Sequence, residues 1–141
     1  MIPLVSGEGI EKLIPQRAPV MMVGALLSYS DEGAETSYVV DDDSWYCVNG
    51  HIDEQGIMEH VAQSAAAWGG YAGYLRGEEP KLGYVAEFSK FEILSMPGAG
   101  KEIRTRIHSL GTAAGVTLME SETVCGEDVV ARGRLKIFIE K

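Results

Sequence analysis

One segment, residues 54–76, constrains the fold of this chain more than any other. Apolar residues recur in it at spacings of three and four, as from Ile57 to Val61 and on to Leu75. This is the periodicity of a helix that buries one stripe against a core. Asp53 is suited to cap its first turn, because its carboxylate can accept hydrogen bonds from free backbone N–H groups. The pattern therefore predicts a long helix that begins near residue 54.

The rest of this helix is unusually slim. Small residues fill positions outside the apolar stripe, namely Ala62, Ala65, Ala66, Gly69, Gly70 and Gly73. Without large side chains, other backbone can approach the helix closely, although each glycine lowers its intrinsic helix propensity. We expect a helix that is wrapped by the remainder of the chain.

Extended stretches flank the helix on both sides. Runs rich in Val, Ile, Thr and aromatic residues, separated by glycine turns, predict strands at residues 20–29, 35–40, 83–94, 101–110, 115–124 and 129–139. A short helix is expected at 10–13, before Pro15. Short connections favour antiparallel pairing, so the prediction is an α+β fold with about six strands around one helix. The 141 residues are expected to form a single domain, 1–141.

Composition excludes several classes of protein. With 12 basic and 21 acidic residues the net charge is -9, which argues against nucleic acid or an anionic membrane as the main partner. No apolar run has the length of a membrane span, and the first residues do not resemble a signal peptide. Two cysteines, Cys47 and Cys125, form neither a disulfide framework nor a metal cluster. A cytoplasmic protein without metal or cofactor is expected.

Glu59 and Gln63 form a polar strip on this otherwise apolar or small-residue helix. They are four residues apart, so they lie one turn from each other on the same face. A solvated face or a structural hydrogen bond is the ordinary explanation for such a pair. A carboxyl group held among Ala, Met and Trp side chains is instead suited to donate a proton, because lost hydration disfavours its charged form.

His51 follows Gly50 on a predicted turn just before the helix. A histidine on a loop is most often only solvated, but here the nearby helix N-terminus favours the neutral imidazole that a base requires. His60 is the rival candidate. It is adjacent to Glu59 but points about a quarter-turn away, so we interpret it as a packing or interface residue.

Three motifs together resemble the 3-hydroxyacyl-acyl-carrier-protein dehydratases. They are LIPQRAPVMMVGALL at 13–27, GH at 50–51 and E-x-x-x-Q at 59–63. The resemblance spans most of the chain and implies the hotdog fold, in which a curved sheet wraps one central helix. It looks closer to a divergent branch, such as the dehydratases of aryl-polyene or related pigment pathways, than to the fatty-acid enzyme.

The resemblance also implies a site. A histidine and a glutamate from two different subunits of a dimer form the active site in this family, and His51 and Glu59 match them. The matching backbone donor for the thioester carbonyl is the N–H of Gly56, and Gln63 matches a supporting glutamine. The implied reaction is dehydration of a 3-hydroxyacyl thioester to the trans-2-enoyl thioester. Met58 and Trp68 are candidates for the lining of an acyl-chain tunnel.

The chain departs from the family in two places. The segment between His51 and Glu59 is shorter than usual and lacks prolines, and Gln16 stands where the family often has histidine. Two alternatives therefore stay open. One is a hotdog thioesterase in which Glu59 acts on water without need of His51. The other is a non-catalytic hotdog subunit that pairs with an active dehydratase.

The resemblance implies an acyl carrier protein as partner, and a homodimer, a higher oligomer of dimers, or a heterodimer with a related dehydratase. Basic residues alternate on two predicted strands and offer a basic strip for an acidic carrier. They are Arg104 and Arg106 on one strand, and Arg132, Arg134 and Lys136 on the other. An ordinary solvated sheet face is the alternative explanation.

Overall fold

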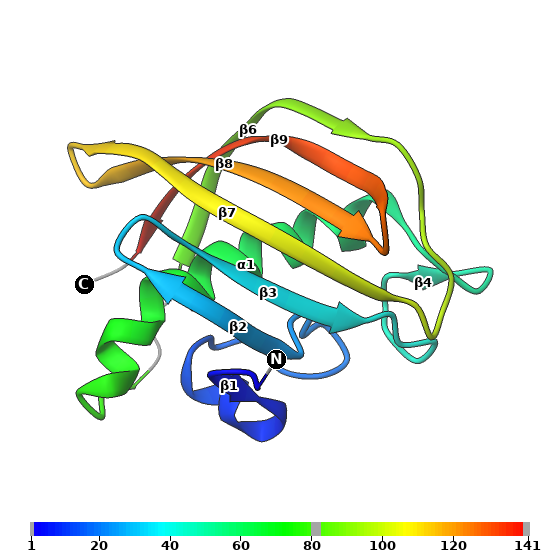
Figure 1. Cartoon of the computed structure of the whole chain (residues 1–141), viewed down its shortest axis with the longest axis horizontal. Coiled ribbons are helices and arrows are strands. Elements are labelled where there is room, and N and C mark those ends of the chain that lie inside the picture. Colours follow the sequence, from blue (N-terminus) through cyan, green and yellow to red (C-terminus); the bar gives the residue numbers. More distant parts are fainter. Residues whose placement is uncertain (1, 80–82, 140–141) are drawn as a thin grey trace.

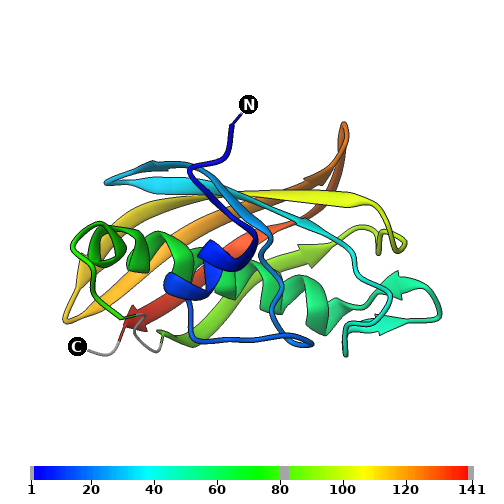
Figure 2. The same ribbon diagram turned by 90° about the horizontal axis from the view of Figure 1, so that it is seen from below.

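Helix α1 (Glu54–Leu75) runs along one face of a curved antiparallel sheet in the computed structural model, which describes residues 2–79 and 83–139 (Figures 1 and 2). The sheet has seven strands. In spatial order they are β1 (Val5–Ser6), β2 (Ala25–Ser30), β3 (Gly33–Val39), β7 (Glu102–Ala113), β8 (Val116–Cys125), β9 (Asp128–Ile139) and β6 (Gly83–Ile93). The expected curved sheet around one central helix is present. Within this sheet, the two-residue strand β1 was not predicted from the sequence.

The core lies between α1 and the sheet. Ile57, Val61 and Ala65 are fully buried on the helix, as the periodicity predicted. Leu75 is the exception to the predicted stripe, with 65% of its surface exposed. The last turn of α1 lies beyond the strands that cover the rest of the helix (Figure 1), so none of the described strands buries the side chain there.

The N-terminal segment approaches the small-residue helix closely. The 3₁₀ helix η1 (Gly7–Lys12) and the residues after it lie across α1 (Figure 2). A Cβ atom added to Gly70 would collide with the carbonyl oxygen of Leu13. The glycine is therefore needed for backbone contact, which is the packing that the slim helix surface predicted.

One strand prediction was wrong at its start. Residues 20–29 were expected to be extended, but β2 begins only at Ala25. The preceding segment is bonded to the helix instead, since Gln63 contacts the backbone of both Val20 and Met22. Side chains of α1 thus take the place of a neighbouring strand as hydrogen-bond partners for this segment.

A second, two-stranded sheet precedes the helix. It consists of β4 (Cys47–Val48) and β5 (His51–Ile52), which pair antiparallel beside the N-terminal end of α1. Strands of two residues are too short to show alternation, so the sequence predicted only a turn here. This hairpin carries His51.

Candidate active site

The β4–β5 hairpin positions His51 on the surface. Its turn residues, Asn49 and Gly50, have φ angles of 53° and 81°. Such positive φ values suit glycine and are tolerated by asparagine, so these residue types are what the turn requires. The turn is held from outside by a hydrogen bond from the N–H of Ala99 to the carbonyl oxygen of Gly50, at 2.8 Å. His51 is thereby anchored at its backbone while its side chain stays exposed.

The His51 ring has one of its two nitrogens engaged. Nδ1 lies 3.1 Å from the carbonyl oxygen of Asn49. A carbonyl oxygen only accepts hydrogen bonds, so Nδ1 carries the proton in this contact. In the neutral ring Nε2 is then left as the unprotonated nitrogen, which is the arrangement of a histidine base. Gly98 packs beside the ring, where an added Cβ would lie 3.9 Å from Nε2.

Glu59 is held by Gln63 one helical turn away. The Gln63 amide nitrogen donates to Oε1 of Glu59 at 2.9 Å and to the carbonyl oxygen of Val20 at 2.8 Å. The amide oxygen accepts from the N–H of Met22 at 2.6 Å. The orientation of this buried amide is fixed, because a flipped amide would face acceptors with its oxygen and a donor with its nitrogen. Gln63 therefore positions one oxygen of the partly buried Glu59.

His60 belongs to the core. It is fully buried, with Nδ1 donating to the carbonyl oxygen of Met22 at 2.6 Å and Nε2 2.8 Å from the hydroxyl of Thr105. That hydroxyl in turn lies 2.6 Å from the hydroxyl of Thr123. Burial lowers the pKa of His60 to about 4, because the interior disfavours its charged form. The sequence left two roles open for His60, packing or an interface, and its burial identifies packing. The ring is neutral at pH 7.

The start of α1 combines a helix cap with close packing around Gly56. Asp53 caps the helix as expected, and its Oδ1 accepts the N–H of Gly56 at 2.7 Å. A Cβ atom on Gly56 would lie 2.6 Å from Cβ of Tyr46 and 2.7 Å from Cγ1 of Ile52. The N–H of Gly56 is thus engaged by the cap and its Cα faces two packed side chains. Its expected oxyanion role stays a prediction.

Within one protomer, His51 and Glu59 do not contact each other; no hydrogen bond or ion pair joins these two described residues. His51 lies on the hairpin and Glu59 on α1 after it. Two of the predicted site residues, Glu59 and Gln63, are thus brought together by the fold of a single chain. The pairing of His51 of one subunit with Glu59 of another, which the family resemblance implies, stays a prediction.

The two tunnel candidates lie in different surroundings. Met58 is half-buried next to Glu59 on α1. Trp68 packs against the core, and its indole N–H donates to the carbonyl oxygen of Ser30 at 2.9 Å. A tunnel lined by these residues stays a prediction.

Tyr46 packs against the start of α1, a contact that the sequence did not indicate. It immediately precedes β4, and its carbonyl oxygen accepts the N–H of Asp53 at 2.8 Å. Burial raises the pKa of the Tyr46 phenol, and the negative charges of Glu59 and Asp53 raise it further. The Tyr46 side chain packs over the first turn of α1, beside Gly56. A lone tyrosine in a short hairpin carries no periodic signal that would have revealed this position.

The basic residues expected to form a positive strip are all paired with carboxylates. The pairs, at N–O distances between 2.9 and 3.9 Å, are Arg104 with Glu35 and Glu102, Arg106 with Glu35, Arg132 with Glu92, Arg134 with Glu120, and Lys136 with Glu87. The strand register also aligns a row of alternating sign across β3, β7, β8, β9 and β6, which runs Glu35, Arg106, Glu122, Arg132, Glu92. This face of the sheet is therefore a ladder of ion pairs rather than a positive strip.

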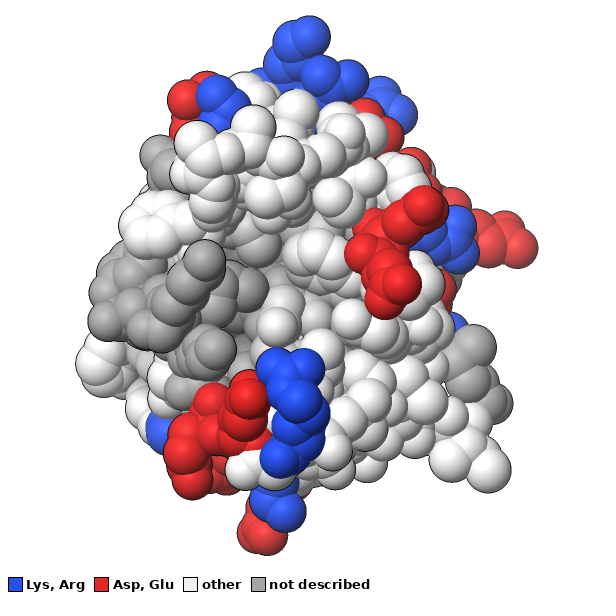
Figure 3. Space-filling model, turned by 90° about the vertical axis from the view of Figure 1, so that its left-hand side faces the viewer, with Lys and Arg blue, Asp and Glu red and all other residues white. Residues whose placement is uncertain are grey.

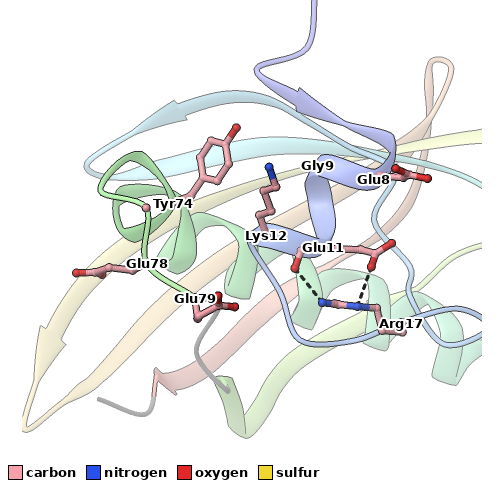
Figure 4. A pocket seen from close by; sticks show the side chains of 9 residues that line it. Glu8, Gly9, Glu11, Lys12, Arg17, Tyr74, Glu78 and Glu79 are labelled. Atoms are coloured by element: carbon pink, nitrogen blue, oxygen red, sulfur yellow. Dashed lines mark hydrogen bonds and ion pairs between the residues drawn. The ribbon is translucent and has the colours of Figure 1, made fainter.

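A cavity of about 870 Å³ lies at the other end of α1, between η1 and the last turn of the helix (Figure 4). Charged residues line most of it, including an ion pair of 2.9 Å between Arg17 and Glu11. In a view of this end of the molecule, acidic and basic side chains gather around a mostly uncharged centre (Figure 3). The cavity is separated from His51 by the length of the helix and is not part of the candidate site.

The described residues contain neither a cluster suited to a metal ion nor a helix suited to a membrane. No group of three or more His, Cys, Asp or Glu side chains in residues 2–79 and 83–139 is placed to hold a metal ion. Over the same part of the chain, no helix has the length and apolar character needed to cross a membrane.

Comparisons with known proteins identify one family. A family model for the ApeP-like proteins, described as ApeP dehydratase, matches residues 8–141. No curated protein sequence matches the chain.

Several solved structures share the fold. A chain of the dehydratase heterocomplex ApeI:P from Xenorhabdus doucetiae has a TM-score of 0.84 at 20% identity, covering 100% of this chain and 93% of that chain. The uncharacterized protein PH1136 from Pyrococcus horikoshii has a TM-score of 0.69 at 12% identity, covering 100% and 96%. A hypothetical thioesterase with coenzyme A from Streptococcus pneumoniae TIGR4 has a TM-score of 0.63 at 10% identity, covering 82% and 84%. The expected hotdog fold is confirmed.

Proposed function

This chain belongs to the ApeP-like family of dehydratases, and on that premise we propose that it removes water from a 3-hydroxyacyl thioester carried by an acyl carrier protein. The product is the trans-2-enoyl thioester, and the pathway served is the synthesis of a polyene chain. The observation that carries the proposal is the hold of Gln63 on Glu59, because it orients an acid on the helix that the family uses for catalysis.

His51 is the base of the proposed reaction. Its Nε2 takes the proton from Cα of the substrate, while the Nδ1–H remains bonded to the carbonyl oxygen of Asn49. This second bond keeps the ring in one tautomer and orientation as the proton is transferred. The exposed position of His51 on the hairpin suits a residue that reaches a substrate bound by the neighbouring subunit.

Glu59 is the acid. It donates a proton to the departing 3-hydroxyl group, which leaves as water, and the electrons of the broken Cα–H bond form the new double bond. Gln63 binds Oε1 of Glu59, so the proton to be donated is assigned to Oε2, to which no described residue is bonded. Each such proton transfer by a placed group contributes about 10²–10⁴ in rate.

The partner that completes the site is a second hotdog subunit. His51 and Glu59 do not meet within one protomer, and the Xenorhabdus structure is described as a heterocomplex of two dehydratase components. We therefore propose that this chain works as a dimer, with a related dehydratase subunit as the partner if the chain is inactive by itself. Thioesterase activity is the competing outcome, since thioesterases share the fold.

The test is mass spectrometry of products from 3-hydroxyacyl and saturated acyl thioesters on carrier protein. Wild type, His51→Ala and Glu59→Gln are assayed alone and after mixing with a related dehydratase subunit. Loss of 18 Da that depends on both residues is expected, with a rate decrease of about 10²-fold or more in each variant. Release of free acid, or dehydration that survives both substitutions, would contradict the proposal.

A further inference from the structure

The side chains of His60 and Gln63 bond the backbone of the same residue, Met22. The ring Nδ1 of His60 donates to the carbonyl oxygen of Met22 at 2.6 Å. The amide oxygen of Gln63 accepts the N–H of Met22, also at 2.6 Å. All three residues are buried, with at most 1% of their surface exposed. Two side chains of α1 therefore hold both backbone polar groups of Met22.

The directions of these hydrogen bonds are fixed by the groups that form them. A carbonyl oxygen only accepts, so Nδ1 of His60 carries the proton of the neutral ring. Nε2 is then an acceptor, and it takes the hydroxyl proton of Thr105, 2.8 Å away. The Thr105 hydroxyl has no second proton to donate, so it accepts from the hydroxyl of Thr123 at 2.6 Å. Each group has one assigned role as donor and one as acceptor.

The bonds continue to the proposed acid. Because the amide oxygen of Gln63 faces Met22, the amide nitrogen faces Glu59 and donates to its Oε1 at 2.9 Å. A continuous row of hydrogen bonds thus runs from Thr123 in β8 through the backbone of Met22 to Glu59. Hydrogen bonds in such a row polarise and strengthen one another. Glu59 is the partly buried end of the row, and the other side chains in it are fully buried.

Loss of the His60 donor would disturb the row at its centre. Met22 lies outside the strands, before β2, so side-chain bonds to α1 take the place of strand pairing there. A buried carbonyl oxygen without a donor costs free energy, and the backbone would shift to find another partner. Gln63 is bonded to this backbone and would shift with it. Displacement of a catalytic group by about 1 Å can lower a rate about 10²-fold.

We propose that His60 is a positioning residue for the acid of the dehydration. By holding the carbonyl oxygen of Met22, it fixes the backbone that orients Gln63. Gln63 in turn orients Glu59. This inference rests on the proposed dehydration, in which Glu59 donates the proton. His60 itself touches no substrate and transfers no proton in the reaction, so its effect reaches the site through the backbone of Met22.

Two substitutions of nearly equal shape isolate the His60 donor. His60→Asn can place an N–H at the position of Nδ1, whereas His60→Leu has a methyl group there, and both lose the contact with Thr105. We expect kcat for dehydration to fall about 10–100-fold in His60→Leu but less than about threefold in His60→Asn, with KM changed less than about threefold in both. Equal kcat values in the two variants would overturn the inference.

Thr36→Val controls for lost stability by itself. The hydroxyl of Thr36 is fully buried and lies 2.7 Å from that of Ser64 on α1. Ser64 bonds the backbone carbonyl oxygen of His60, not its ring. We expect the urea unfolding midpoint of Thr36→Val to fall, while kcat stays within about twofold of wild type. A kcat as low as that of His60→Leu would show that destabilisation causes the loss, and would overturn the inference.

Nuclear magnetic resonance tests the row of hydrogen bonds without turnover. In the wild type, ¹⁵N shifts of the His60 ring should identify Nδ1 as the protonated nitrogen, although free neutral histidine favours a proton on Nε2. A proton on Nε2 would refute the row, even if His60→Leu does not fold. The side-chain amide signals of Gln63 are identified by their loss in Gln63→Glu. They should move toward the values of an exposed glutamine in His60→Leu and stay in place in His60→Asn.

These measurements separate the inference from the proposed function. Displaced Gln63 signals in His60→Leu, in a protein that removes no water from 3-hydroxyacyl substrates, would retain the row of bonds and overturn the dehydration, and with it the role of His60. Dehydration that depends on Glu59 but is equally fast in His60→Leu and His60→Asn would retain the function and overturn the inference.

Discussion

The side-chain amide of Gln63 donates a hydrogen bond of 2.9 Å to Glu59, and the same amide bonds the backbone of Val20 and Met22. One buried side chain thus connects the proposed acid to a segment about forty positions earlier in the sequence. Catalytic orientation and the attachment of the N-terminal segment to α1 therefore depend on the same group.

Gln63→Glu is expected to damage both roles. The substitution keeps the shape and the acceptor for Met22, but it removes the N–H groups that serve Glu59 and Val20. We expect dehydration to slow by about 10–100-fold through misplacement of Glu59, and the free energy of unfolding to fall by about 1–3 kcal/mol. Steady-state kinetics and urea denaturation measure the two effects. Gln55→Glu, on the exposed first turn of α1, is the control, and an equally small effect at both positions would contradict this account.

Gly56→Ala is expected to destabilise the protein although alanine is the better helix former. The new Cβ would lie 2.6 Å from Cβ of Tyr46 and 2.7 Å from Cγ1 of Ile52. Overpacking of this kind costs about 1–3 kcal/mol, which exceeds the gain of about 1 kcal/mol in propensity. Gly73→Ala is the control, because its Cβ would closely approach only the carboxylate end of Glu78, 2.9 Å away. The melting temperature of Gly56→Ala should fall, whereas that of Gly73→Ala should rise or change clearly less.

The stability of the protein should decrease between about pH 6.5 and pH 4 because of His60. Its pKa is lowered from 6.5 to about 4 in the folded protein, so the unfolded chain takes up a proton first as the pH falls. The neutral buried ring contributes its full stabilisation above pH 6.5. Relative to that, the free energy of unfolding is lower by about 2 kcal/mol at pH 5 and about 3 kcal/mol at pH 4.

Urea unfolding at pH 7 and pH 5 tests this dependence. His60→Gln removes the titrating group, so the decrease between the two pH values should be smaller in the variant by about 2 kcal/mol. An identical decrease in both proteins would show that other groups cause it.

Removal of a single cation from the ion-pair ladder should have little effect on carrier binding. Arg106 lies between Glu35 and Glu122 in the strand register, so its positive field is largely cancelled. For Arg106→Gln we expect less than about 1 kcal/mol of lost stability and less than a twofold change in KM for carrier-bound substrate. Lys101→Gln alters the net charge equally and serves as the control. A large, salt-sensitive rise in KM for Arg106→Gln alone would identify this face as the carrier-binding site.

Much of the secondary structure could be predicted from local patterns. Asp53 caps α1 as expected, and the helix ends at Leu75, next to the predicted Arg76-Gly77 boundary. The four strands after the helix lie within a few residues of their predicted ranges. Caps, turns and periodicity depend on residues close together in the chain, so their signal is present in the sequence itself.

The helix start and the sheet face show contacts that local patterns did not reveal. Gly56 matched a family position, but only the structure shows that Asp53 occupies its N–H and that Tyr46 packs on its Cα. The cations of β7 and β9 were expected to share one face of the sheet, yet their carboxylate partners come from other strands as well. These pairings depend on strand register and order, which local patterns do not encode.

The sequence by itself determined the long slim helix, its cap, the extended stretches and the resemblance to dehydratases, because each depends on short-range spacing or on a matched motif. Only the tertiary structure decided which donors and acceptors are already occupied. Met22 and Gln63 are 41 positions apart, and His60 and Thr105 are 45 apart. Such contacts form only when the chain has folded around α1, since burial obliges each polar group to find its partner among the residues that packing brings near.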